Sequence, residues 1–267
     1  MKYLKTQKTF LIVWAIFLGA ALILPDSGMA AGWYLRGAAG YEQSRAADFS
    51  DTNCSSATPP ALFGCATGND GQRIGAYGDF GRFPLAEVAM GRRILPWLRT
   101  DLSFAYRFHM DYEGNANFLS VGANQPVSAK ADSFNGMVNL FVDMNGIPGV
   151  KKLWRFQPYA GGGIGLSYNR IGQMTFLFPD NAGAHKVSVT ASGDRKDFAF
   201  ILAVGTGIVL TRQLTMDIAY RYADLGRVGT SPGNMYMNTL PAGIAVNDIE
   251  TRLRSHGLTV GLRYHFE

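Results

Sequence analysis

The sequence predicts an all-β fold in which eight antiparallel strands close into an up-and-down barrel that spans a membrane. Apolar and polar residues alternate with a period of two in eight segments, which is typical of strands with two chemically different faces. Short and long connections alternate between these segments, as they do in membrane barrels. Glycine accounts for 32 of the 267 residues. This is well above its usual share of about 7% and suits a narrow interior filled by small side chains.

Residues 1–30 precede this pattern and have the features of a secretory signal peptide. Three lysines are followed by an uncharged apolar run over residues 10–24, and Gly28 and Ala30 suit cleavage after Ala30. The run is shorter than the ~20 residues of a spanning helix. We therefore expect a cleaved signal peptide and one barrel domain, residues 31–267. Cleavage removes three lysines and one aspartate and lowers the formal net charge from +5 to +3, which is too small to favour nucleic acid as a partner.

Four segments alternate regularly and four less cleanly. The regular segments are residues 98–112, 132–145, 214–222 and 257–266. The others are residues 33–42, 85–94, 157–169 and 197–210. The segment 85–94 can instead begin earlier, near Ile74, with a break at Pro84, and this alternative stays open. Within residues 98–112 the pattern places Phe108 and Met110 on the apolar face and Arg107 and His109 on the polar face.

The connections alternate in length. The shorter ones are residues 95–97, residues 211–213 and about ten residues that contain Pro148 and Trp154. The long, polar ones cover about residues 43–72, 113–131, 170–196 and 225–250. In barrels of the outer membrane the turns face the periplasm and the loops face outward. The chain is therefore expected to have three shorter periplasmic turns and four long outer loops.

The composition of the two faces predicts which one meets lipid. One face carries Phe, Tyr, Leu and Ile, and the other carries Gly, Ala, Ser and Asn with scattered charges. An eight-stranded barrel has little interior space, so the bulky face is expected outside, and a soluble barrel around a ligand is disfavoured. Aromatic residues near the strand ends are expected to form two girdles at the membrane interfaces. They are Trp33, Trp97, Trp154, Phe156, Tyr264 and Phe266 at the periplasmic rim, and Tyr41, Phe108, Tyr112, Phe134, Tyr168 and Phe198 at the outer rim.

Several segments resemble those of a known family. Residues 137–143 (MVNLFVD), 158–165 (PYAGGGIG), 214–222 (LTMDIAYRY) and 224–226 (DLG) resemble the opacity-type and OmpA-like small outer-membrane barrels. The resemblance implies an integral protein of a Gram-negative outer membrane, surrounded by lipid and lipopolysaccharide. The last strand resembles the assembly signal that the barrel assembly machinery reads in this family, although Glu267 follows the final aromatic residue. Its outward residues are Leu258, Val260, Leu262, Tyr264 and Phe266.

The polar faces of the strands place charged residues inside the barrel. These are Arg36, Glu42, Glu87, Asp101, Arg107, Asp143, Asp217, Arg221 and Arg263. Acids and bases nearly balance, and unpaired charges in a narrow lumen would be costly. One interpretation is a salt-bridged plug that stiffens the barrel, and the other is a narrow gated pore. Eight strands leave little lumen, which favours the plug.

The two cysteines, Cys54 and Cys65, are expected to form a disulfide in the first long loop, because the periplasm is oxidising. Closing so short a loop stabilises the fold by roughly 2–3 kcal/mol in the chain-entropy model. A metal site is disfavoured because no histidine lies near them in the sequence. We expect no metal and no cofactor.

A catalytic site would need a nucleophile, a histidine base and an orienting acid in contact. Ser255 and His256 are neighbours on a strand and point to opposite faces. His185 and Ser188 lie in a loop, and His109 with Asp111 is expected to form part of the polar lining. His265 likewise falls on the polar face of the last strand. No catalytic residue is predicted, and a lipid A-modifying enzyme is a minor alternative.

The long loops are the remaining candidates for function, since binding residues often lie on loops held by a rigid scaffold. The first loop carries the predicted disulfide and Pro59-Pro60. The fourth contains Pro232, Met235, Tyr236, Met237 and Pro241. These side chains can bind a partner surface or pack over the barrel mouth, and both remain open. We expect a non-catalytic role in the cell envelope and in surface interaction with a host or other surface ligand. The main alternative is a narrow porin-like channel.

Overall fold

The computed structural model describes residues 32–59, 65–68, 71–117, 125–151, 153–177, 187–237 and 240–266. For residues 187–188, 235–237 and 240–241 it describes the backbone alone. The predicted signal peptide lies outside these ranges, as do His185, Pro60 and Glu267.

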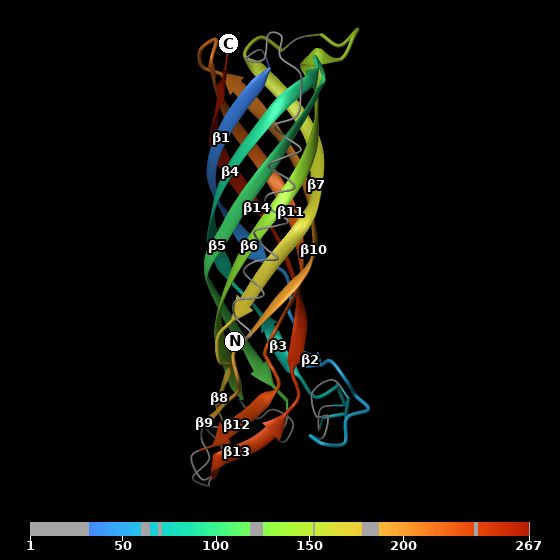
Figure 1. Cartoon of the computed structure of the whole chain (residues 1–267), viewed down its shortest axis with the longest axis vertical. Helices are drawn as coiled ribbons and strands as arrows, with labels where there is room; N and C mark the ends of the chain where they lie inside the picture. The colour runs from blue at the N-terminus through green and yellow to red at the C-terminus, as the bar shows by residue number, and fades with distance from the viewer. Residues whose placement is uncertain are drawn as a thin grey trace, which may run out of the picture. The chain divides into compact units, whose positions relative to one another are not determined.

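Eight strands form a closed antiparallel ring (Figure 1), as the alternation predicts. In ring order they are β1 (Trp33–Ser44), β4 (Arg82–Leu95), β5 (Leu98–Ala116), β6 (Pro126–Asp143), β7 (Phe156–Ile171), β10 (Gly193–Val209), β11 (Leu214–Gly229) and β14 (Ile249–His265). The ring closes between β1 and β14, which pair from Tyr34 opposite His265 to Ser44 opposite Ser255. The helical content of the described residues is the 3-10 helix η1 (Met144–Gly146), and no helix there is long and apolar enough to cross a membrane.

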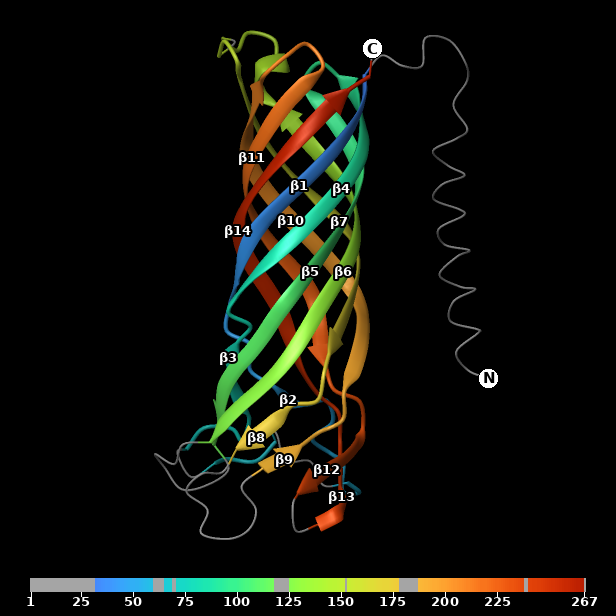
Figure 2. The ribbon, with the colours of Figure 1, turned by 90° about the vertical axis from the view of Figure 1, so that its left-hand side faces the viewer.

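The connections between the ring strands define two ends of the barrel (Figure 2). Residues 96–97, 144–155 and 210–213 join strands at one end, here called the turn end. Residues 45–81, 117–125, 172–192 and 230–248 join strands at the other, the loop end. The second of these is shorter than expected because β5 and β6 run well past the predicted strand limits.

The two faces of the wall have the predicted chemistry. Outward residues such as Leu35, Ile164 and Leu258 are more than half exposed. On β7 the glycines at 161, 163 and 165 alternate along the inner face opposite Phe141, Asn139 and Met137 of β6. A Cβ at Gly163 would overlap the Asn139 side chain. Glycines on one strand therefore make room for large inward side chains on its neighbour.

One prediction about β5 is wrong. The register with β6 shifts between Arg107 and Met110, and His109 adopts a left-handed φ of 53°. This bulge inserts one residue, so the faces exchange beyond it. Met110 and Tyr112 point inward and are fully buried, whereas His109 and Asp111 are exposed. Tyr112 is therefore not part of the outer girdle, and His109 with Asp111 is not part of the polar lining.

The break before β4 also lies elsewhere than Pro84, which sits within the strand. It falls at Phe80 and Gly81, where Gly81 has a φ of 62°. The preceding segment is a separate strand, β3 (Ala76–Asp79), which pairs with the end of β5. A positive φ of this kind favours glycine because it has no Cβ.

The third and fourth loops contain strands that join into one sheet. Strand β8 (Thr175–Leu177) pairs with the start of β6, and β9 (Val187–Val189) pairs with β8. The fourth loop adds β12 (Gly233–Met237) to β9 and β13 (Leu240–Val246) to β12. The short β2 (Ser50–Asp51) of the first loop pairs with the start of β14. The loop end is thus continuous with the barrel wall.

An apolar core fills the inner space at the loop end. Eleven of its members, which we call the loop-end core, are Phe49, Phe80, Phe83, Met110, Tyr112, Met174, Phe176, Leu225, Val228, Ile249 and Leu253. The Tyr112 ring meets those of Phe49 and Phe80 edge-on, at centroid distances of 5.0 and 5.3 Å. The Tyr112 hydroxyl donates to the Ala76 carbonyl at 2.9 Å. Burial raises the pKa of the Tyr112 phenol well above its usual range, so the hydroxyl keeps the proton that it donates.

Candidate functional site

The structure places all nine charged residues predicted for the lumen inside the barrel, each less than a tenth exposed. It adds Arg99, which lies on the polar face predicted for β5 and is 1% exposed. We call these ten residues the lumen network. It contains five arginines and five carboxylates, so its formal charge is zero.

The part of the network nearest the loop end centres on Arg107 and Glu42. The Arg107 guanidinium donates to both carboxylate oxygens of Glu42, with Nε–Oε2 at 2.7 Å and Nη2–Oε1 at 3.0 Å. Ser255 donates to Glu42 at 2.6 Å, and Arg107 Nη1 donates to Asn135 at 2.5 Å. Two parallel N–H···O bonds are the strongest geometry that an arginine and a carboxylate can form.

The middle part centres on Glu87, which lies between two arginines. Its carboxylate pairs with Arg36 at 2.7 Å and with Arg221 at 2.6 Å. Arg36 Nη2 also lies 3.8 Å from Asp101, which accepts a hydrogen bond from Tyr34 at 2.9 Å. Arg36 and Glu87 lie on the paired strands β1 and β4, whereas Arg221 lies on β11, three strands away from β4 in the ring, so the Glu87–Arg221 contact crosses the lumen.

The part nearest the turn end contains two further pairs. Arg99 Nε lies 2.9 Å from Asp143, and Arg263 Nη2 lies 3.0 Å from Asp217. The Arg99 guanidinium also lies 4.5 Å from the ring centres of both Phe141 and Tyr159. Stacking on two aromatic faces fixes a cation in a dry setting.

Several buried polar atoms of the network and of the neighbouring Asn135 have no protein partner among the described residues. They include Arg221 Nη2, Arg263 Nη1, Asn135 Nδ2 and Asp217 Oδ2. Buried polar groups in proteins are nearly always hydrogen-bonded to protein or water. We therefore expect ordered water between the side chains of the network.

The histidine and serine residues do not assemble a catalytic group within the described ranges. Ser255 is buried and donates to Glu42, whereas His256 faces outward beside Tyr220, with ring centres 6.0 Å apart. His265 lies 3.4 Å from the Thr215 hydroxyl. Of Ser188 only the backbone is described. The same ranges contain no group of three or more His, Cys, Asp or Glu residues able to hold a metal ion.

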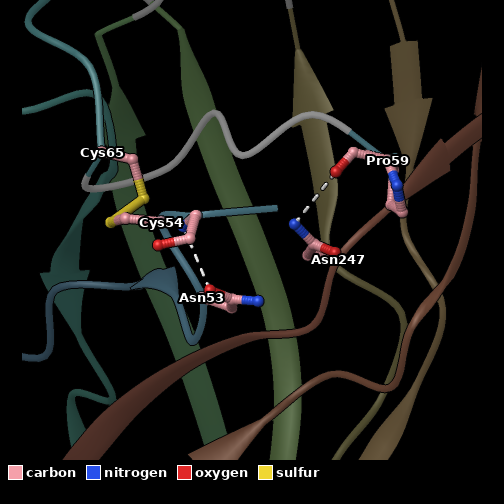
Figure 3. Close-up of a disulfide and its surroundings, with 6 residues drawn as sticks. Asn53, Cys54, Pro59, Cys65 and Asn247 are labelled. Carbon is pink, nitrogen blue, oxygen red and sulfur yellow. Dashed lines mark hydrogen bonds between the residues drawn. A yellow bond between two sulfur atoms is a disulfide. The ribbon is translucent and has the colours of Figure 1, made fainter. Parts of the chain in front are cut away.

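The first loop is tied both to itself and to the fourth. The predicted disulfide Cys54–Cys65 is present (Figure 3). The side chain of Asn53 accepts a hydrogen bond from the backbone of Ser55 at 3.0 Å. Thr52 donates to Asp248 at 2.8 Å, just before β14. Two distant parts of the chain are thus held side by side.

Asn247, next to Asp248, extends this link in Figure 3. Its side-chain amide donates to the Pro59 carbonyl at 3.5 Å, and Ser56 donates to the same carbonyl at 2.6 Å. Pro232 of the fourth loop is exposed. The side chains of Met235, Tyr236, Met237 and Pro241 lie outside the described residues.

Comparison with known proteins identifies the family. The model of the outer membrane protein β-barrel domain matches residues 14–266. Outer membrane protein PagN of Salmonella typhimurium is 24% identical over 63% of this chain and 65% of its own length, so the chain aligns with slightly less than two thirds of that relative. A putative adhesin of Rickettsia bellii is 25% identical over 67% of this chain and 73% of its own. Among solved structures, the outer membrane protein OprG of Pseudomonas aeruginosa is 14% identical to this chain, with a TM-score of 0.47. The match covers 89% of this chain and 98% of the OprG chain.

Proposed function

We propose that this chain, which belongs to the outer membrane protein β-barrel family, is a non-catalytic surface-interaction protein that binds a partner through its loop end. It is an integral protein of the outer membrane. In such barrels the long loops face outward, so the loop end meets the medium. The resemblance to a relative named as a putative adhesin supports this role.

The observation that carries the proposal is the construction of the loop end. Three of the four loops contribute strands that pair with the barrel or with one another, in the order β6-β8-β9-β12-β13 and through β2 and β14. The disulfide and the Thr52–Asp248 hydrogen bond further limit the movement of the first loop. A binding surface that is ordered beforehand loses less conformational entropy when a partner binds.

The lengths of the strands add to this argument. A transmembrane strand needs about 9–11 residues, whereas β5 has 19 and β6 has 18. The extra residues lie on the loop side, where outward positions such as Asp111, Glu113 and Lys130 are charged and exposed. This supports a barrel that carries its loops clear of the lipid surface.

The contents of the barrel interior support a closed lumen rather than an open channel. The charges of the lumen network are paired, and the Arg107–Glu42 and Arg221–Glu87 pairs join strands that are not neighbours in the ring. The loop-end core occupies the inner space above them. Ions would have to displace fully buried aromatic side chains to pass. We therefore infer that the polar interior stiffens the scaffold on which the loops are held.

The test replaces residues 233–246 with a short Gly-Ser linker and compares adherence of bacteria that display either protein to cultured epithelial cells. We expect the replacement to remove adherence without affecting assembly, which the unheated gel shift of a closed barrel reports. A matched control shortens residues 147–151 at the turn end and should leave adherence unchanged. Full adherence of the assembled 233–246 variant would refute binding through this loop sheet.

A further inference from the structure

Two arginines on the outer surface share one carboxylate. Asp224 of β11 accepts hydrogen bonds from Arg252 Nε, at 2.9 Å to each oxygen, and from Arg254 Nε at 3.1 Å. Asp224 faces outward by strand parity, yet the two arginine side chains cover it and leave it 3% exposed. The arginine side chains themselves are 51% and 47% exposed. Asp224 therefore holds two guanidinium groups side by side on the surface.

Their remaining donors are open to solvent or lipid. Within the described residues, the hydrogen bonds of Arg252 and Arg254 to protein use only Nε. Each guanidinium retains two Nη groups with four N–H donors in a planar fork. A carboxylate already fixes the orientation of both forks, so an incoming oxyanion would meet prepositioned donors.

Two more arginines extend this cationic surface. The backbone N–H of Arg45 donates to the Arg254 carbonyl at 2.9 Å, which places the two residues next to each other. Arg82 lies on the adjoining strand and donates to Gln43 at 3.0 Å. The ion pairs formed between described residues include neither Arg45 nor Arg82. We call the four arginines together with Asp224 the arginine cluster. Its formal charge is +3.

The cluster lies just beyond the aromatic rim of the lipid-facing wall. On β14, His256 is two residues from Arg254 towards the turn end and stands opposite Tyr222 of β11. Leu258 follows and is 59% exposed, as part of the apolar outer face. A step of two residues along a strand is about 7 Å. Aromatic girdles mark the interface between the acyl chains and the headgroups, so the arginine cluster lies at the level of the lipid headgroups.

We propose that the arginine cluster binds the phosphate group of a phosphorylated lipid headgroup in the outer leaflet. The site opens sideways above the apolar wall, where a lipid whose acyl chains lie against Leu258 would bring its headgroup. A phosphate offers the oxygen geometry that a planar guanidinium recognises through two hydrogen bonds. This inference is independent of the loop surface proposed above, because it concerns the wall of the barrel.

The test measures lipid binding to the refolded barrel in detergent micelles by native mass spectrometry. The probes are lipid A with both phosphates and the same lipid A without phosphate. The double substitution Arg252→Gln/Arg254→Gln should weaken binding of the phosphorylated lipid by about tenfold or more, since it removes charge-assisted hydrogen bonds. The matched control Lys130→Gln/Arg170→Gln removes two exposed cations from β6 and β7, on another side of the barrel, and should leave the affinity unchanged.

Three results would overturn the proposal. The first is equal binding of phosphorylated and dephosphorylated lipid A to the unmodified protein. The second is unchanged binding to an Arg252→Gln/Arg254→Gln barrel whose gel shift shows that it has folded. The third is full competition by inorganic phosphate at the lipid's own concentration, which would assign the arginine cluster to a soluble anion. A loss confined to the phosphorylated lipid and to this variant would support the proposal.

Discussion

Removal of Arg107 should destabilise the barrel severely, because it leaves the Glu42 carboxylate buried without its cation. Glu42 is 1% exposed and receives two hydrogen bonds from Arg107, at 2.7 and 3.0 Å. In Arg107→Met it keeps only the bond from Ser255. Breaking one side of a buried ion pair costs about 3–5 kcal/mol. The folding equilibrium constant should therefore fall by roughly two to four powers of ten.

The cause of that loss can be separated from a loss of packing. Glu42→Gln removes the buried charge and leaves an acceptor for Ser255, so Glu42→Gln/Arg107→Met should recover most of the stability and cost less than about 2 kcal/mol. The assay is urea unfolding of the refolded protein in lipid vesicles, followed by tryptophan emission and unheated gel mobility. Asp111→Asn, on the exposed part of the same strand, is the control and should change stability by less than about 0.5 kcal/mol. A loss below about 1 kcal/mol in Arg107→Met, or a double variant as unstable as the sum of the two single ones, would refute the reasoning.

Four further predictions test other parts of the structure. In a planar bilayer the refolded protein should give no discrete conductance steps, and reproducible steps would show an open lumen instead. Ile164→Arg, on the apolar outer face, should cost about 2–4 kcal/mol of unfolding free energy in vesicles, whereas Ser128→Arg near the loop end should cost almost nothing. Tyr112→Phe should cost about 0.5–1.5 kcal/mol through the lost hydrogen bond to Ala76, and a neutral result would show that this bond adds no net stability. Reduction of Cys54–Cys65 should lower stability by roughly 2–3 kcal/mol, and an unchanged midpoint with and without reductant would show that the loop is already held by its other contacts.

The lumen charges were predictable from the sequence because strand parity is a local property. Arg36, Glu87 and Asp217 each alternate with apolar neighbours, and each lies inside the barrel as that alternation requires. Their partners were not predictable. Glu87 and Arg221 are 134 positions apart in sequence and meet only because the ring closes. Pairing across a lumen depends on register and strand tilt, which no short segment specifies.

The errors have the same origin. The bulge near His109 leaves no clear sign in the alternation, because apolar and polar residues still alternate on both sides of it. The inserted residue only turns the apolar residues after it inward and the polar ones outward. The loop-end core was missed because Phe49 comes from a connection that reads as polar and Phe80 from the segment between that connection and the predicted second strand. Both become buried only when the neighbouring strands surround them. Asp224 likewise reads as a surface carboxylate until Arg252 and Arg254 of β14 are paired beside it.

The sequence by itself determined that the chain forms eight strands, which face of each strand points outward except beyond the bulge of β5, and where the disulfide lies. Each of these follows from the order of residues over a dozen positions or fewer, together with the polarity of the surroundings. Only the tertiary structure decided which charges pair, that an apolar core closes the loop end, that two loops share a sheet, and that two arginines meet on one carboxylate. Those features join residues distant in the chain, and their geometry is fixed by the closure of the ring.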